Sequence, residues 1–125
     1  MTLNIHTITE NFKMLTNLTN DELERYSGII ASAKGYFERL LMRDFASDEE
    51  RNLCEHACAA KAYFDYTVFM AATTNTHPTQ SGSVFVRVGD NACVKNAETL
   101  MYNALAALPA GLVRDNGFVF ERTDG

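Results

Sequence analysis

Hydrophobic residues recur every three or four positions in three successive segments of the N-terminal half, which is the periodicity of amphipathic helices. The first segment, residues 3–18, places Ile5, Ile8 and Phe12 at helical spacing. We expect a short helix or N-terminal arm over residues 1–18.

The second segment predicts one long helix from about Asn20 to Arg43. Thr19 and Glu22 have the spacing of a capping box, in which each residue binds the backbone of the other. The apolar positions recur at spacings of 3, 4, 3, 4 and 3: Leu23, Tyr26, Ile30, Ala33, Phe37 and Leu40. This stripe would face the core.

The third segment predicts a helix from about Asp48 to Ala72, opened by a second capping box between Ser47 and Glu50. One face is formed by Leu53, Ala57, Ala60, Phe64, Val68 and Ala71. Its second half, AYFDYTVFMAA, is apolar on nearly every side, a pattern typical of a buried helix. In so small a domain, part of that burial would come from another subunit.

The remaining chain mixes loops, strands and one more helix. Residues 73–83 lack any large apolar side chain and predict a mobile loop. Alternating residues predict strands near 84–88 and 118–122, which would pair with each other. Between them we expect a helix with Ala97, Met101, Ala104 and Leu108 on one face. The expected fold is mainly α, a small helical bundle with a short two-stranded β element.

Length and charge narrow the possible functions. The 125 residues fit a single domain, 1–125. The net charge is −5 and the basic residues are scattered singly, which argues against a surface that grips DNA. No apolar run approaches the roughly 20 residues of a membrane span, so we expect no membrane contact and a chain made in the cytosol.

The cysteines and histidines are the first candidates for chemistry. Cys54 and Cys58 share a helix face and could bind one metal ion, or Cys58 could act as a nucleophile. Cys93 lies far along the chain, and neither His56 nor His77 belongs to a catalytic motif. We favour a core role for Cys54 and Cys58 as small reduced residues, and expect no catalytic residue, metal or cofactor.

Two further clusters also have simpler explanations. Asp48, Glu49 and Glu50 could form an acidic site, but they complement the dipole of the helix that they begin. An aromatic group could line a ligand pocket, although a core or subunit contact is the simpler interpretation. Its members are Tyr63, Phe64, Tyr66 and Phe69.

The order of these elements resembles that of the head–tail connector (adaptor, or head-completion) proteins of tailed bacteriophages and prophages. The similarity covers about Asp21 to Thr123. Three stretches carry it: ERNLCEHACAAKAYFDYTVF from Glu50 to Phe69, VFVRVGDNACVKNAETLMYNAL from Val84 to Leu105, and LVRDNGFVFERT from Leu112 to Thr123.

The resemblance implies a structural virion subunit without catalytic activity. Such subunits form a homo-oligomeric ring below the portal, extend the DNA channel and dock the next head-completion or tail protein. DNA would pass through without tight binding, and the subunit could be a monomer in the host cytoplasm before it joins the head–tail junction.

Two other classes remain open. One is a small helical partner-binding or regulatory module of bacterial origin, without catalysis. The other is an enzyme that uses Cys58 or a metal at Cys54 and Cys58.

Overall fold

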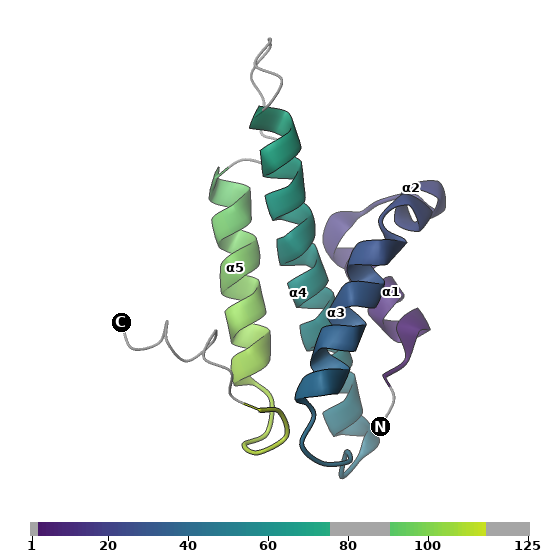
Figure 1. The fold of residues 1–125 in the computed structure, drawn as a ribbon, viewed down its shortest axis with the longest axis vertical. Helices are drawn as coiled ribbons and strands as arrows, with labels where there is room; N and C mark the ends of the chain where they lie inside the picture. The colour runs from purple at the N-terminus through teal and green to yellow at the C-terminus, as the bar shows by residue number, and fades with distance from the viewer. Residues whose placement is uncertain (1–2, 76–90, 115–125) are drawn as a thin grey trace.

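The computed structural model describes residues 3–75 and 91–114, and within them the chain is mainly helical. The long helix α4 (Asp48–Asn75) is central: α5 (Asn91–Ala106) packs along one side, and α1 (Ile5–Thr16) and α3 (Ser27–Leu40) along the other (Figure 1). The short helix α2 (Asn20–Arg25) precedes α3. The predicted helical bundle is therefore confirmed for these residues.

Helix α1 is bounded by an asparagine at each end. The side chain of Asn4 accepts hydrogen bonds from the backbone N–H groups of His6 and Thr7, at 2.9 and 3.4 Å, and so caps the first turn. Asn17 ends the helix with a φ of 61°, a left-handed conformation that asparagine tolerates better than most residues. The predicted helix within residues 3–18 is confirmed.

The second predicted helix is wrong in its continuity, because residues 20–40 form two helices that meet at Tyr26. The Thr19–Glu22 capping box is present and opens α2 as predicted. At Tyr26 the backbone leaves the helical region, with φ −103° and ψ 16°. Ser27 and Gly28 follow, and such Gly/Ser pairs are sites of helix kinks.

The second helix also ends earlier than Arg43, because the chain after Leu40 turns to meet the C-terminal segment. Leu41 is extended and forms an isolated antiparallel bridge with Val113. The N–H of Met42 donates to the carbonyl of Leu112 at 2.9 Å, and the N–H of Arg114 donates to the carbonyl of Leu40 at 2.7 Å. These bonds replace the next helical turn.

The start of α4 contains only half of the predicted second capping box. The N–H of Glu50 donates to the hydroxyl of Ser47 at 3.3 Å. The Glu50 carboxylate does not return to Ser47: it accepts from the N–H of Ala46 at 2.8 Å and binds Arg43. An ion pair across the α3–α4 connection therefore takes the place of the reciprocal bond.

The end of α4 differs from the prediction in two ways. The helix continues to Asn75, so the predicted loop 73–83 is wrong for its first three residues. The hydroxyl of Thr73 donates to the carbonyls of Phe69 and Met70, at 3.2 and 3.1 Å. The Thr73 side chain therefore bonds to the preceding helical turn and not to solvent as in the predicted loop. The predicted apolar face is also wrong at Val68, which is 43% exposed.

Helix α5 confirms the predicted helix after residue 90. Ala97, Met101 and Ala104 are buried against α4, as expected. Leu108 lies beyond the end of α5 and is only partly buried, because the helix stops at Ala106 before Pro109.

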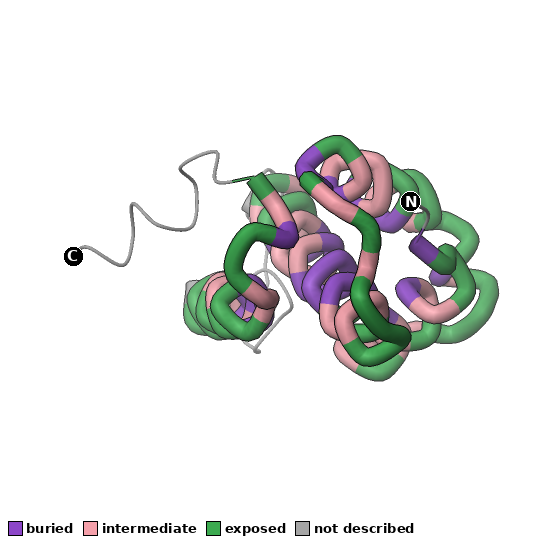
Figure 2. The backbone as a smooth tube through the Cα atoms, turned by 90° about the horizontal axis from the view of Figure 1, so that it is seen from below, coloured by how far each residue is buried: buried purple, intermediate pink, exposed green. Residues whose placement is uncertain are grey.

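The core combines large side chains from the outer elements with small ones from α4. The largest buried apolar residues are Phe12, Phe37, Leu3, Ile8, Ile30 and Leu112. On α4 the wholly buried apolar positions are all small: Cys54, Ala57, Cys58, Ala59, Ala60 and Ala62. Figure 2 shows the buried positions gathered where the helices face one another. Small residues on the central helix let its neighbours approach closely.

The predicted strands at 84–88 and 118–122, and the rest of the loop to residue 83, lie outside the described residues. In residues 3–75 and 91–114 the only β feature is the Leu41–Val113 bridge. Over the same residues, none of the helices combines the length and apolar character that crossing a membrane requires.

Candidate functional site

Cys54 and Cys58 lie one turn apart on α4, and both are fully buried in the core. His56 is exposed, so its imidazole does not join the two thiols. Burial raises the pKa of the Cys58 thiol, and the neighbouring Cys54 raises it further. Because the thiolate is the form that attacks carbon or binds a metal, this environment disfavours both reactions. The predicted core position of the pair is confirmed.

Cys93 lies on α5, away from the other two cysteines. Its Sγ is 4.0 Å from the hydroxyl oxygen of Tyr63 on α4. The pKa of Tyr63 is raised mainly by burial and, to a smaller extent, by the Cys93 thiol. His6 is exposed on α1, and His77 lies outside the described residues. Within the described parts of the chain, no three His, Cys, Asp or Glu side chains gather as a metal site would require.

The acidic first turn of α4 is engaged in ion pairs. Asp48 binds Arg51 one turn later. Glu50 binds both terminal nitrogens of Arg43, at 2.9 and 3.3 Å, and so ties α4 to the connection that precedes it. The pKa of Glu50 is lowered mainly by the hydrogen bond from Arg43 and secondly by the hydrogen bond from the N–H of Ala46. These contacts support a structural role for the acidic turn.

The aromatic group on α4 divides between the core and the surface. Tyr66 is buried and meets two rings edge to face: Phe12 at 5.8 Å and Tyr26 at 4.9 Å between centroids. Burial raises the pKa of the Tyr66 hydroxyl. Phe69, one turn further on, is 47% exposed and also meets the ring of Tyr26 edge to face, with the centroids 6.3 Å apart.

An open groove of about 440 Å³ runs beside Phe69, where the α2–α3 junction crosses α4. It is lined by Arg25, Tyr26, Gly28, Ile29 and Phe69, and we refer to it as the aromatic groove. Gly28 follows the break at Tyr26 and lines this groove, and a Cβ at that position would meet no atom within 4 Å, so the space beside it is open. The groove combines apolar rings with one cationic side chain, a composition common at protein–protein contacts.

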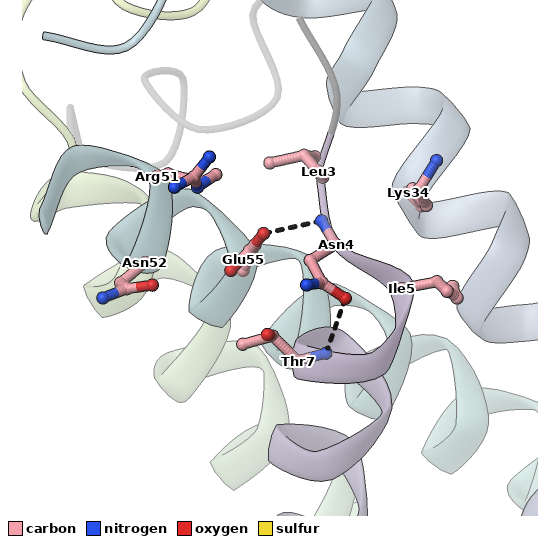
Figure 3. A pocket seen from close by; sticks show the side chains of 8 residues that line it. All are labelled: Leu3, Asn4, Ile5, Thr7, Lys34, Arg51, Asn52 and Glu55. Carbon is pink, nitrogen blue, oxygen red and sulfur yellow. Dashed lines mark hydrogen bonds between the residues drawn. The ribbon is translucent and has the colours of Figure 1, made fainter. Parts of the chain in front are cut away.

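A second pocket, of about 620 Å³, opens where the segment before α1 crosses α3 and α4 (Figure 3). We refer to it as the strap pocket. It is lined by residues 3–5 and by Thr7, Lys34, Arg51, Asn52 and Glu55. Its lining is mainly polar and comes from α1, α3, α4 and the segment before α1, residues 3–4, which we call the strap. The pocket is therefore formed by the tertiary fold and not by one local motif.

Two carboxylates hold the strap beside this pocket. Glu55 on α4 accepts a hydrogen bond from the N–H of Asn4 at 2.6 Å, and Glu38 on α3 accepts one from the N–H of Leu3 at 3.0 Å. Glu38 also pairs with Lys34 at 2.9 Å. The pKa of Glu38 lies below its usual value. Partial burial alone would raise this pKa, but the hydrogen bonds from Leu3 and Lys34 together outweigh that effect.

Sequence reasoning missed Glu55, which is only 1% exposed. Glutamate is rarely this buried, and Glu55 stands between Cys54 and exposed His56 in an otherwise ordinary helical pattern. The only indication in the sequence that Glu55 could be buried is that it directly follows a buried position, Cys54, on a helix rich in small residues. Because the partner of Glu55 is a backbone N–H 51 residues away, no local pattern could identify it.

No protein-family model matches this chain, and no curated protein or solved structure is significantly similar to it.

Proposed function

We propose that this chain is a structural subunit of a phage head–tail connector. In this role it forms a ring below the portal, extends the DNA channel and docks the next tail component. The aromatic groove is the observation that carries the proposal. Exposed apolar surface of this kind is typical of protein contacts, and Phe69 keeps 47% of its surface in water although it lies beside a well-packed core.

A ring requires head-to-tail contacts between two different surfaces of the same chain. The aromatic groove supplies a suitable first surface, because Tyr26 and Phe69 leave an open, largely apolar space at one corner of the bundle. In the proposed ring, a different surface of the neighbouring copy enters this groove. Burial of Phe69 at that contact would stabilise the ring through the hydrophobic effect.

The charges of the bundle also support this role. Four basic side chains of the described residues are paired with carboxylates in Lys34–Glu38, Arg43–Glu50, Arg51–Asp48 and Lys61–Asp65. A paired cation has less to gain from a DNA phosphate, and the whole chain carries a net charge of −5. A channel component of this kind would let DNA pass without gripping it.

Co-expression with the portal protein of the same genome tests this proposal. Native mass spectrometry should detect a complex of the portal with several copies of the chain. Phe69→Ser should abolish that complex while circular dichroism remains unchanged. Met42→Ser is the matched control, because Met42 is 61% exposed but lies in the α3–α4 connection, at the other end of α4.

The contrary result is a wild-type chain that remains a monomer or dimer and does not bind the portal. That result would favour a small helical partner-binding or regulatory module over a connector subunit.

A further inference from the structure

Among the described residues, no cation pairs with the buried carboxylate of Glu55, whereas Glu38 pairs with Lys34 and Asp48 pairs with Arg51. In the described part of the chain, the hydrogen-bond partner of Glu55 is the N–H of Asn4, which contacts only Oε2. A carboxylate offers about four acceptor sites. A buried charge is costly unless it is paired and hydrogen-bonded, so the second oxygen, Oε1, favours a donor.

The two basic residues that line the strap pocket do not supply this donor. Lys34 pairs with Glu38 and Arg51 pairs with Asp48. Figure 3 shows Lys34 on α3 and Arg51 on α4, on either side of Glu55. The pocket therefore retains a buried acceptor although two cations lie close by.

We propose that the strap pocket binds a guanidinium group, presented as an arginine side chain by a partner protein. A guanidinium has five N–H donors in a planar fork, which suits a carboxylate oxygen that has further neutral acceptors in the same pocket. Thr7 and Asn52 supply a hydroxyl and an amide oxygen in the same pocket. Ile5, which is 38% exposed at the rim, offers apolar surface to the methylene stem of an arginine.

Other ligand classes fit this pocket less well. A metal ion would need several hard ligands, and among the described residues that line the pocket Glu55 is the only carboxylate. An anion would meet the Glu55 carboxylate, and the two cations among the described lining residues, Lys34 and Arg51, are already paired. This inference is independent of the proposed connector function, because Glu55 and Phe69 lie 14 positions apart on α4, about 21 Å along its axis.

The test is an NMR titration of the full chain with N-acetyl-arginine methylamide, which mimics an arginine within a protein. Saturable shifts of the amide signals of Asn4, Thr7 and Glu55 are expected. Glu55→Gln should weaken binding about tenfold or more, since a hydrogen bond to a charged group is lost, while glutamine keeps an acceptor for Asn4. Glu49→Gln is the matched control and should bind as the wild type does, because Glu49 is exposed on the same helix.

Two further arms separate the alternatives. Thr7→Ala leaves the buried carboxylate untouched and should weaken binding by a smaller factor, so the test does not rest on folding of Glu55→Gln. The lysine analogue, with its compact ammonium, should bind more weakly than the arginine derivative. Equal affinity of wild type and Glu55→Gln, equal affinity for the two derivatives, or tighter binding of free arginine would each overturn the proposal.

Discussion

The ring of Tyr26 meets the ring of Tyr66 edge to face, with centroids 4.9 Å apart and planes inclined by 74°. This contact joins the break between α2 and α3 to the middle of α4. Tyr66→Ala should lower the free energy of unfolding by about 3–5 kcal/mol, as for other large buried aromatic residues. In a double-mutant cycle with Tyr26→Ala, measured by urea denaturation, we expect a coupling of about 0.5–1.5 kcal/mol. Strictly additive effects would mean that the rings do not support each other.

Gly35 and Gly111 should respond in opposite ways to alanine. Gly35 lies within α3, and a Cβ there would meet only the flexible end of Arg39, at 3.5 Å. Gly35→Ala should therefore raise the free energy of unfolding by up to about 1 kcal/mol. Gly111 has a φ of +83°, so Gly111→Ala should lower it by about 1–2 kcal/mol through backbone strain. Thermal unfolding of both variants checks these signs, and a stabilised Gly111→Ala would contradict the turn geometry.

The three cysteines should differ in their reaction with a thiol reagent. Cys54 and Cys58 are fully buried, and burial raises the pKa of Cys58, whereas Cys93 is partly exposed. Dithionitrobenzoate should label Cys93 first in the folded protein, and all three cysteines after denaturation. Peptide mapping identifies the modified residue. Rapid labelling of Cys58 in the folded state would revive a catalytic or metal-binding role for the pair.

The Arg43–Glu50 ion pair predicts a pH-dependent stability. The hydrogen bond from Arg43, followed by that from Ala46, lowers the pKa of Glu50 below its value in the unfolded chain. The stabilisation is therefore complete above the unfolded pKa, about 4.3, and is lost as the pH falls through the folded value. Glu50→Gln should be less stable than the wild type at pH 7, and the difference should shrink below about pH 4.

Urea denaturation at several pH values measures this difference. Arg43→Gln should remove much of the same pH dependence, because the guanidinium is the main cause of the shift. A Glu50→Gln deficit that stays constant from pH 7 to pH 3 would show that the carboxylate charge does not act in this way.

The sequence predicted the helices well where local signals and hydrophobic spacing agree. The Thr19–Glu22 capping box and the buried positions Leu23, Ile30 and Phe37 are confirmed. The break at Tyr26 was missed because its causes are partly distant: the Ser27–Gly28 pair permits it, and the ring contact with Tyr66 favours it. A continuous apolar stripe cannot reveal such a contact between helices.

The sites were less predictable than the fold. The aromatic residues of α4 were identified, but which of them faces the core depends on the helices that pack around α4, so Tyr66 is buried and Phe69 is exposed. The strap pocket depends on hydrogen bonds between residues 35 and 51 positions apart, from Leu3 to Glu38 and from Asn4 to Glu55. Helical periodicity reports only neighbours within two turns and could not detect these bonds.

The proposed connector ring requires the aromatic groove to be a contact between copies of this chain. A photo-reactive phenylalanine analogue at position 69, introduced into the chain co-expressed with its portal protein, can capture this contact covalently. After irradiation we expect a covalent dimer of the chain in which position 69 is joined to a surface that does not contain Phe69, as a head-to-tail ring requires. A portal-bound chain that forms no cross-link to a second copy would contradict it.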